Sequence, residues 1–171
     1  VQTIAEAAQC WTFPLVVDPV MFSSKGSPLL DRAGHEAMVE LLIPRASLLT
    51  PNLAEASGLA GFSVTDVASM RRAAETIATR GPQNVLVKGG HLLGEAVDIL
   101  FSNGHMHEFA AQRIPSTQTH GTGCTYSAAI TAELAKGTAL PDAVARAKTF
   151  ITRAIQWAPG LGHGTGPLNH F

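Results

Sequence analysis

The chain has 171 residues, of which 46% are hydrophobic, and this length and composition suit one globular domain with a sizeable core. Its 12 basic and 13 acidic residues nearly cancel, so there is no electrostatic support for a nucleic-acid partner. No stretch approaches the roughly 18 apolar residues of a membrane span. The two cysteines, Cys10 and Cys124, form no disulfide framework or metal-finger spacing. We therefore expect a cytoplasmic α/β protein that binds a small molecule and neither nucleic acid nor a membrane.

The first residues have apolar side chains at helical spacing without a capping residue before them. The chain is therefore expected to begin inside a helix, with part of the domain missing upstream. Residues 13–18 then form a short apolar run, which predicts a buried parallel strand that ends at Asp18. Because ligands bind at the carboxyl edge of such sheets, Asp18 is a candidate metal-site or phosphate-site residue. The alternative is a turn or cap aspartate.

A helix is predicted over residues 29–42, with Pro28 in its first turn and an end before Pro44. A second strand over residues 46–49 follows it.

Asn52 and Glu55 come directly after that second strand and stand three residues apart. This spacing is typical of a capping box, which would explain both residues structurally. The functional alternative is that both residues help to hold a hydrated Mg²⁺ ion, which usually keeps several of its waters.

Residues 63–80 have the 3.6-residue periodicity of an amphipathic helix, which ends at Gly81-Pro82. A third strand is predicted over residues 84–88. It places Lys88, followed by Gly89 with no side chain, at the same edge of the sheet. A cation there is a candidate for pairing with a nucleotide phosphate, and a solvated strand-end lysine is the alternative.

Two runs at residues 96–101 and 105–109 flank Asn103-Gly104, which predicts an antiparallel hairpin. In the last helix, opened by Pro141-Asp142, Lys148 lies on the apolar face. We interpret it either as a lysine that snorkels to solvent or as a nucleotide-binding residue.

The stretch from Thr119 to Thr125 contains two glycines, Gly121 and Gly123, immediately before a helix predicted over residues 125–136. Glycines let the backbone turn its amides toward one point, and a helix start favours negative charge. The pattern predicts an anion cradle that suits a phosphate, with an ordinary glycine turn as the alternative.

Five motifs follow one another along the chain: Asp18-Pro19-Val20-Met21, Leu49-Thr50-Pro51-Asn52 with Glu55, Val87-Lys88-Gly89-Gly90-His91, Thr119-His120-Gly121-Thr122-Gly123-Cys124-Thr125 and Gly166-Pro167-Leu168-Asn169-His170-Phe171. Together and in this order they resemble the hydroxymethylpyrimidine/phosphomethylpyrimidine kinases of the ribokinase superfamily. The resemblance covers essentially all 171 residues but only the carboxyl-terminal two thirds of the family, whose pyrimidine-binding amino-terminal part has no counterpart here.

The resemblance implies a ribokinase-like three-layer α/β/α fold, with a mostly parallel sheet, an antiparallel hairpin and one truncated domain over residues 1–171. It also implies ATP- and Mg²⁺-dependent phosphorylation of 4-amino-5-hydroxymethyl-2-methylpyrimidine and its monophosphate in thiamine biosynthesis. For the site, the resemblance implies an anion hole formed by Gly121, Thr122 and Gly123. It implies nucleotide-binding residues, which are Lys88, Gly89, Asn52, Thr119 and Lys148. It also implies that Asp18 and Glu55 bind Mg²⁺.

Cys124 stands where most ribokinase relatives carry an aspartate as general base. A helix start lowers the pKa of a thiol, so a useful thiolate fraction is expected there. Because a metaphosphate-like transition state needs little base assistance, the alternative is that Cys124 only positions the alcohol.

Two other functions stay open at this point: a non-catalytic fragment that binds nucleotide or a partner, and a pyridoxal kinase. Self-association into a homo-oligomer is also open.

Overall fold

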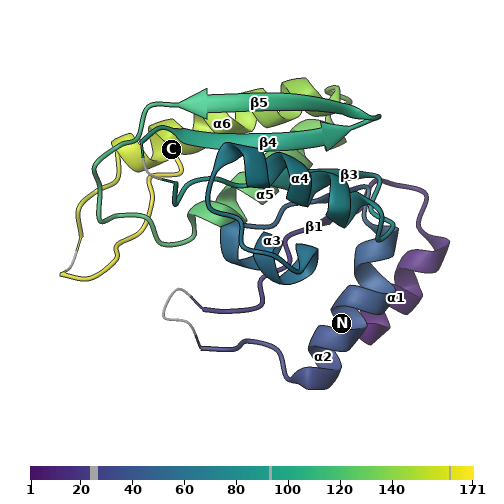
Figure 1. Ribbon diagram of the computed structural model, residues 1–171. Coiled ribbons are helices and arrows are strands. Elements are labelled where there is room, and N and C mark those ends of the chain that lie inside the picture. Colours follow the sequence, from purple (N-terminus) through teal and green to yellow (C-terminus); the bar gives the residue numbers. More distant parts are fainter. Residues whose placement is uncertain (24–26, 93, 162) are drawn as a thin grey trace.

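The computed structural model describes residues 1–23, 27–92, 94–161 and 163–171, which build one mixed sheet covered by helices (Figure 1). The strands are β1 (Val16–Val17), β2 (Leu48–Leu49), β3 (Asn84–Val87), β4 (Ala96–Ser102) and β5 (His105–Ala111). The helices are α1 (Gln2–Ala7), α2 (Arg32–Ala37), α3 (Leu53–Ala60), α4 (Val67–Ala78), α5 (Thr122–Ala135) and α6 (Leu140–Gln156). Shorter turns of helix are Ala8–Cys10, Met38–Leu42 and Ile43–Arg45. No helix among the described residues is long and apolar enough to span a membrane.

The five strands lie in the order β1-β2-β3-β4-β5. β1, β2 and β3 run parallel, whereas β4 pairs antiparallel with both β3 and β5. The predicted hairpin is confirmed: Asn103 and Gly104 have positive φ angles of 50° and 77°, as a tight two-residue turn between β4 and β5 requires.

Two hydrophobic cores lie on opposite faces of the sheet, because successive side chains of a strand point to opposite sides. Leu49, Val85 and Val87 belong to the core with α3 and α4, while Leu48 and Leu86 belong to the core with α5 and α6. Figure 1 shows α4 against one side of the sheet and α5 and α6 against the other. The predicted three-layer α/β/α architecture is therefore confirmed.

The predicted helix over residues 29–42 is wrong at both ends. α2 begins at Arg32, not near Pro28, because the Asp31 side chain caps it by accepting a hydrogen bond from the Gly34 amide at 2.7 Å. Helical structure also continues past the predicted stop, since Pro44 lies near the start of a 3₁₀ turn, where its missing amide is not needed.

Other predicted boundaries differ as well: α4 begins at Val67, not at residue 63, because the Asp66 side chain caps it by accepting from the Ser69 amide. β1 and β2 are two-residue strands, shorter than their apolar runs. α5 begins at Thr122, about one turn before the predicted start, with Gly121 as its N-cap at a φ of 80°. Gly121 and Gly123 therefore flank Thr122, the first residue of the helix, so the predicted anion cradle is the first turn of α5 and not a loop before it.

Candidate active site

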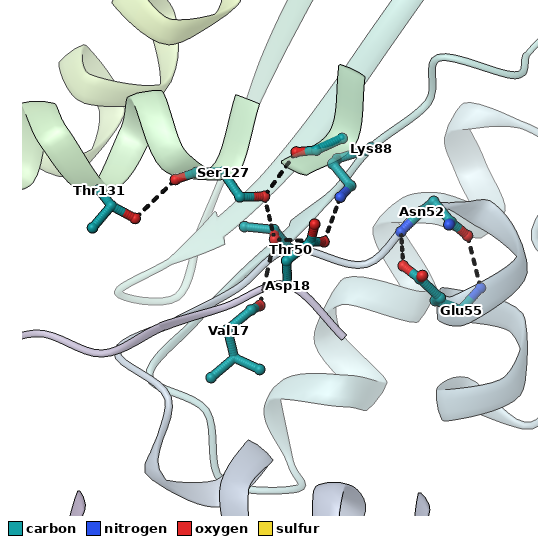
Figure 2. A network of polar contacts seen from close by, with 9 residues as sticks. Val17, Asp18, Thr50, Asn52, Glu55, Lys88, Ser127 and Thr131 are labelled. Atoms are coloured by element: carbon teal, nitrogen blue, oxygen red, sulfur yellow. Dashed lines mark hydrogen bonds and ion pairs between the residues drawn. The ribbon is translucent and has the colours of Figure 1, made fainter. Parts of the chain in front are cut away.

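The ends of the three parallel strands bring Asp18, Asn52 and Lys88 together at the carboxyl edge of the sheet (Figure 2). A parallel bridge between Asn52 and Lys88 continues the pairing of β2 with β3 in the same register, three residues beyond the Leu49–Val85 pair. The Lys88 Nζ lies 2.6 Å from the Asp18 Oδ1, and both side chains are largely buried. This ion pair is the centre of the site, because both charges are held at the edge where ligands of α/β sheets bind.

The first turn of α5 faces Lys88. A Cβ atom added to Gly123 would lie 3.2 Å from the Lys88 Nζ, so the ammonium group lies directly over the backbone of this turn. Lys88 and Gly123 therefore share one edge of the sheet.

The amino end of α5 has no side-chain cap, whereas Asp31, Asn52 and Asp66 cap α2, α3 and α4. The first amides of an α-helix have no intrahelical acceptor, so those of Gly123 and Cys124 are available to a ligand. The Thr119 carbonyl accepts hydrogen bonds from both the amide and the hydroxyl of Thr122, which closes the turn before the helix. A lysine and free helix amides together suit a phosphate group.

A pair of buried hydroxyls, which sequence reasoning missed, connects this turn to the strand ends. The Thr50 Oγ1 lies 2.9 Å from the Ser127 Oγ and 3.3 Å from the Asp18 Oδ1. The Ser127 hydroxyl, which faces Thr50 in Figure 2, also donates to the Gly123 carbonyl at 3.1 Å. Thr50 belongs to the Leu49-Thr50-Pro51-Asn52 motif. Ser127 lies in an Ala-rich helix, where nothing in the local sequence distinguishes it.

Asn52 and Glu55 form the predicted capping box of α3. The Asn52 side chain accepts a hydrogen bond from the Glu55 amide at 2.9 Å, and the Glu55 carboxylate accepts one from the Asn52 amide at 2.8 Å. Glu55 is only 4% exposed, and its burial, opposed in part by the Asn52 amide and Lys88, raises its pKa. The structural interpretation of these two residues is confirmed, and their role toward Mg²⁺ stays a prediction.

The oxygen atoms here suit Mg²⁺ better than a softer metal. Among the described residues no group of three or more His, Cys, Asp or Glu side chains could hold a metal ion. Mg²⁺ does not need such a cage, since it keeps several waters and binds one or two carboxylates plus phosphate oxygens. Asp18 and Glu55 are close enough for the charge of Asp18 to contribute to the raised pKa of Glu55, and their joint role toward Mg²⁺ stays a prediction.

The predicted lowering of the Cys124 pKa is wrong. Partial desolvation, followed by the negative charge of Asp18, raises the pKa of this thiol, and Lys88 offsets the rise only in part. Sequence reasoning considered the helix start alone, whereas the tertiary structure places a carboxylate beside the thiol. Cys124 is exposed and carries a free thiol.

Lys148 does not snorkel to solvent, contrary to the first interpretation. It is 9% exposed, and its Nζ lies 2.6 Å from the Asp98 Oδ2 of β4. The structure thus does not place it with Lys88 and Asp18, and its predicted contact with nucleotide is not supported by this geometry.

Arg113, also missed, holds the loop that follows Lys88. Its guanidinium group donates to the carbonyls of Gly90, Leu92 and Gly94. The loop after β3 is thereby tied to the segment that leads into the cradle.

The chain resembles proteins of known families along nearly its whole length. The phosphomethylpyrimidine kinase family matches residues 1–169. The thiamine biosynthesis bifunctional protein ThiED of Geobacter sulfurreducens is 50% identical over 158 residues, which are 92% of this chain and 32% of that protein. The hydroxymethylpyrimidine/phosphomethylpyrimidine kinase of Haemophilus influenzae is 43% identical over 162 residues, and this chain spans 60% of its length.

A solved structure is similar as well. The ADP complex of Bacillus subtilis pyridoxal kinase has a TM-score of 0.86 and 37% sequence identity, and the match covers 99% of this chain and 66% of that one.

Proposed function

Because the chain belongs to the phosphomethylpyrimidine kinase family, we propose that it provides the nucleotide and phosphoryl-transfer site of an ATP-dependent kinase in thiamine biosynthesis. Its substrates are 4-amino-5-hydroxymethyl-2-methylpyrimidine and the monophosphate of that alcohol. The observation that carries the proposal is the position of the Lys88 ammonium group over the uncapped first turn of α5.

Phosphoryl transfer needs positioning and charge neutralisation more than covalent chemistry by the protein. The free amides of Gly123 and Cys124 bind phosphate oxygens, and Lys88 neutralises the charge that develops on the transferred group. Gly121 is needed at the N-cap because its φ of 80° is strained for residues with a side chain. Thr122 and Thr119 fix the turn through the hydrogen bonds between them.

Asp18 has a second role beside its ion pair with Lys88. Without a ligand, the two charges neutralise each other at 2.6 Å. With a nucleotide bound, phosphate oxygens would replace Asp18 as the partner of Lys88. Asp18 and Glu55 would then hold Mg²⁺, whose positive charge would offset that of the phosphates. The Gly89 amide, directly after Lys88, donates to Asp98, and Asn52, which pairs with Lys88 across the sheet, caps α3.

Cys124 positions the attacking alcohol in this proposal. Because its raised pKa keeps the thiol protonated near neutral pH, Cys124 acts by hydrogen bonding to the alcohol and not as a general base.

The proposal is tested by measuring phosphorylation of the pyrimidine alcohol. Lys88→Met is expected to lower kcat for the pyrimidine alcohol by about 100-fold or more, because an ammonium group that stabilises the transition state is lost. Lys136→Met is the matched control: this exposed lysine at the carboxyl end of α5 pairs with Glu133 and should leave kcat unchanged. A Lys88→Met protein that retains wild-type turnover would contradict the proposal.

A second candidate function is pyridoxal phosphorylation, favoured by the similarity to a pyridoxal kinase of known structure. Comparing kcat/KM for the pyrimidine alcohol and for pyridoxal decides between the two. A higher kcat/KM for pyridoxal would show that pyridoxal is the substrate, and the proposed roles of the phosphoryl-transfer residues would stay the same.

A further inference from the structure

A buried ion pair lies behind the loop that carries Lys88. The Lys148 ammonium group of α6 donates to the Asp98 Oδ2 at 2.6 Å and to the Ala96 carbonyl at 2.8 Å. The Asp98 side chain is 3% exposed and the Lys148 side chain 11%. Burying two charges costs free energy that a surface pair would not, so a purely structural role is a weak explanation.

The other oxygen of Asp98 holds the residue that follows Lys88. The Asp98 Oδ1 accepts a hydrogen bond from the Gly89 amide at 2.9 Å. Gly89 is pressed against β4, since a Cβ atom there would lie 1.9 Å from the Val97 carbonyl oxygen. The Lys88 amide, for its part, donates to the Pro51 carbonyl at 2.8 Å. The backbone is thus fixed on both sides of Lys88.

We propose that Asp98 and Lys148 are positioning residues for phosphoryl transfer. Asp98 holds the Gly89 peptide and thereby sets the reach of Lys88 toward the first turn of α5. Lys148 neutralises Asp98, so that its charge does not oppose an anion bound above Gly89. This inference rests on the proposed kinase function.

The surroundings of the pair support a role in alignment. Tyr126 of α5, two residues after Cys124, places its ring centroid 6.0 Å from the Lys148 Nζ. Burial, followed by the charge of Asp98, raises the pKa of Tyr126 well above its ordinary value, so the phenol is neutral. The ion pair therefore lies among β4, α6, α5 and the loop after β3. The last two of these carry the proposed phosphate contacts, so the pair can hold them in place relative to each other.

Two uncharged double variants separate the effect of the Asp98 hydrogen bond to Gly89 from the effect of the two buried charges. Asp98→Asn with Lys148→Met removes both charges but keeps an oxygen that accepts from the Gly89 amide. Asp98→Leu with Lys148→Met removes the same charges and the acceptor while nearly conserving shape. Lys148→Met alone leaves a buried unpaired carboxylate and is expected to lose stability, so the double variants decide.

We expect the Asn-containing variant to keep kcat within about tenfold of wild type, and the Leu-containing variant to lose about 100-fold with little change in the KM of the alcohol. Hydrogen exchange of the Gly89 amide, followed by NMR, should be as slow as in wild type in the first variant and faster in the second. Equal kcat and equal Gly89 exchange in the two variants would overturn the inference.

The same experiment separates this inference from the proposed function. A wild-type protein without kinase activity would overturn the proposed function. The affinity for ADP and the exchange of Gly89 would then still decide whether Asp98 orders the nucleotide site: a weaker affinity in the Leu-containing variant alone would support it, and equal affinities would overturn it.

Discussion

The thiol of Cys124 is subject to opposing influences from its helix and from its neighbours. Its position in the first turn of α5 favours the thiolate, because the amino end of a helix carries partial positive charge. Partial desolvation, followed by the charge of Asp18, favours the protonated thiol and raises its pKa, and Lys88 offsets this rise only in part. At the residue scale, the site therefore disfavours a thiolate at Cys124, although its lysine and helix amides suit a bound phosphate.

We predict that Cys124 reacts with iodoacetamide more slowly than a free cysteine at pH 7. Only the thiolate reacts, and a raised pKa shifts its formation to higher pH, so the rate should rise with a midpoint above the usual thiol value of about 8.5. The measurement is a pH profile of alkylation in a Cys10→Ser background, since Cys10 is the other exposed thiol.

A saturating Mg²⁺–nucleotide complex should slow the alkylation of Cys124, because this residue belongs to the helix turn whose amides we propose bind phosphate. A midpoint below pH 8 would show that the helix start prevails over Asp18 and would restore the general-base role.

At the scale of elements, the site depends on how α5 is docked onto the sheet. Ser127 and Thr50 make this contact through their buried hydroxyls, one on the helix and one at the end of β2. Because Ser127 also binds the Gly123 carbonyl, the docking contact reaches the first turn that holds the cradle.

We predict that Ser127→Ala lowers the free energy of unfolding by about 1–2 kcal/mol, since it leaves the buried Thr50 hydroxyl without its closest partner. It should also weaken ADP binding, because the turn is no longer held against Asp18. Urea denaturation and titration with Mg²⁺–ADP measure the two effects.

Thr131→Ala is the matched control for this variant. Its hydroxyl donates only to the Ser127 carbonyl within the same helix, and alanine is the better helix former, so stability and ADP affinity should change little. Equal losses in the two variants would mean that the link between α5 and β2 is not what holds the cradle.

At the scale of the whole molecule, the site exists only when both faces of the sheet are covered. Asp18, Lys88 and Gly123 are distant in the chain, and they meet because α5 docks on one face while β1, β2 and β3 align their ends. A nucleotide should therefore bind the folded chain and not the unfolded one.

We predict that Mg²⁺–ADP raises the Tm of residues 1–171, with a gain that grows with ligand concentration. Binding to the native state alone stabilises by about 2.7 kcal/mol at 100 times Kd. Differential scanning fluorimetry over a concentration series measures the shift, and Mg²⁺ alone is the reference.

Lys88→Met should abolish most of this shift, and Lys136→Met should leave it intact. A Tm that does not respond to Mg²⁺–ADP would count against a nucleotide site in this chain.

The sequence alone determined the parts that depend on neighbours along the chain. Periodicity located α4 and α6, the Asn103-Gly104 pair located the hairpin, and the glycines at 121 and 123 located the cradle. Residues at strand ends, such as Asp18 and Lys88, were identified because parallel strands end at a common edge.

Only the tertiary structure decided what each side chain faces. Asp98 and Lys148 are 50 residues apart, and Thr50 and Ser127 are 77 apart, so no local pattern relates them. The raised pKa of Cys124 arises from desolvation and from Asp18, which approaches it across the sheet edge. A local signal reports the shape a segment prefers, whereas partners, burial and charge environment follow from how the layers pack.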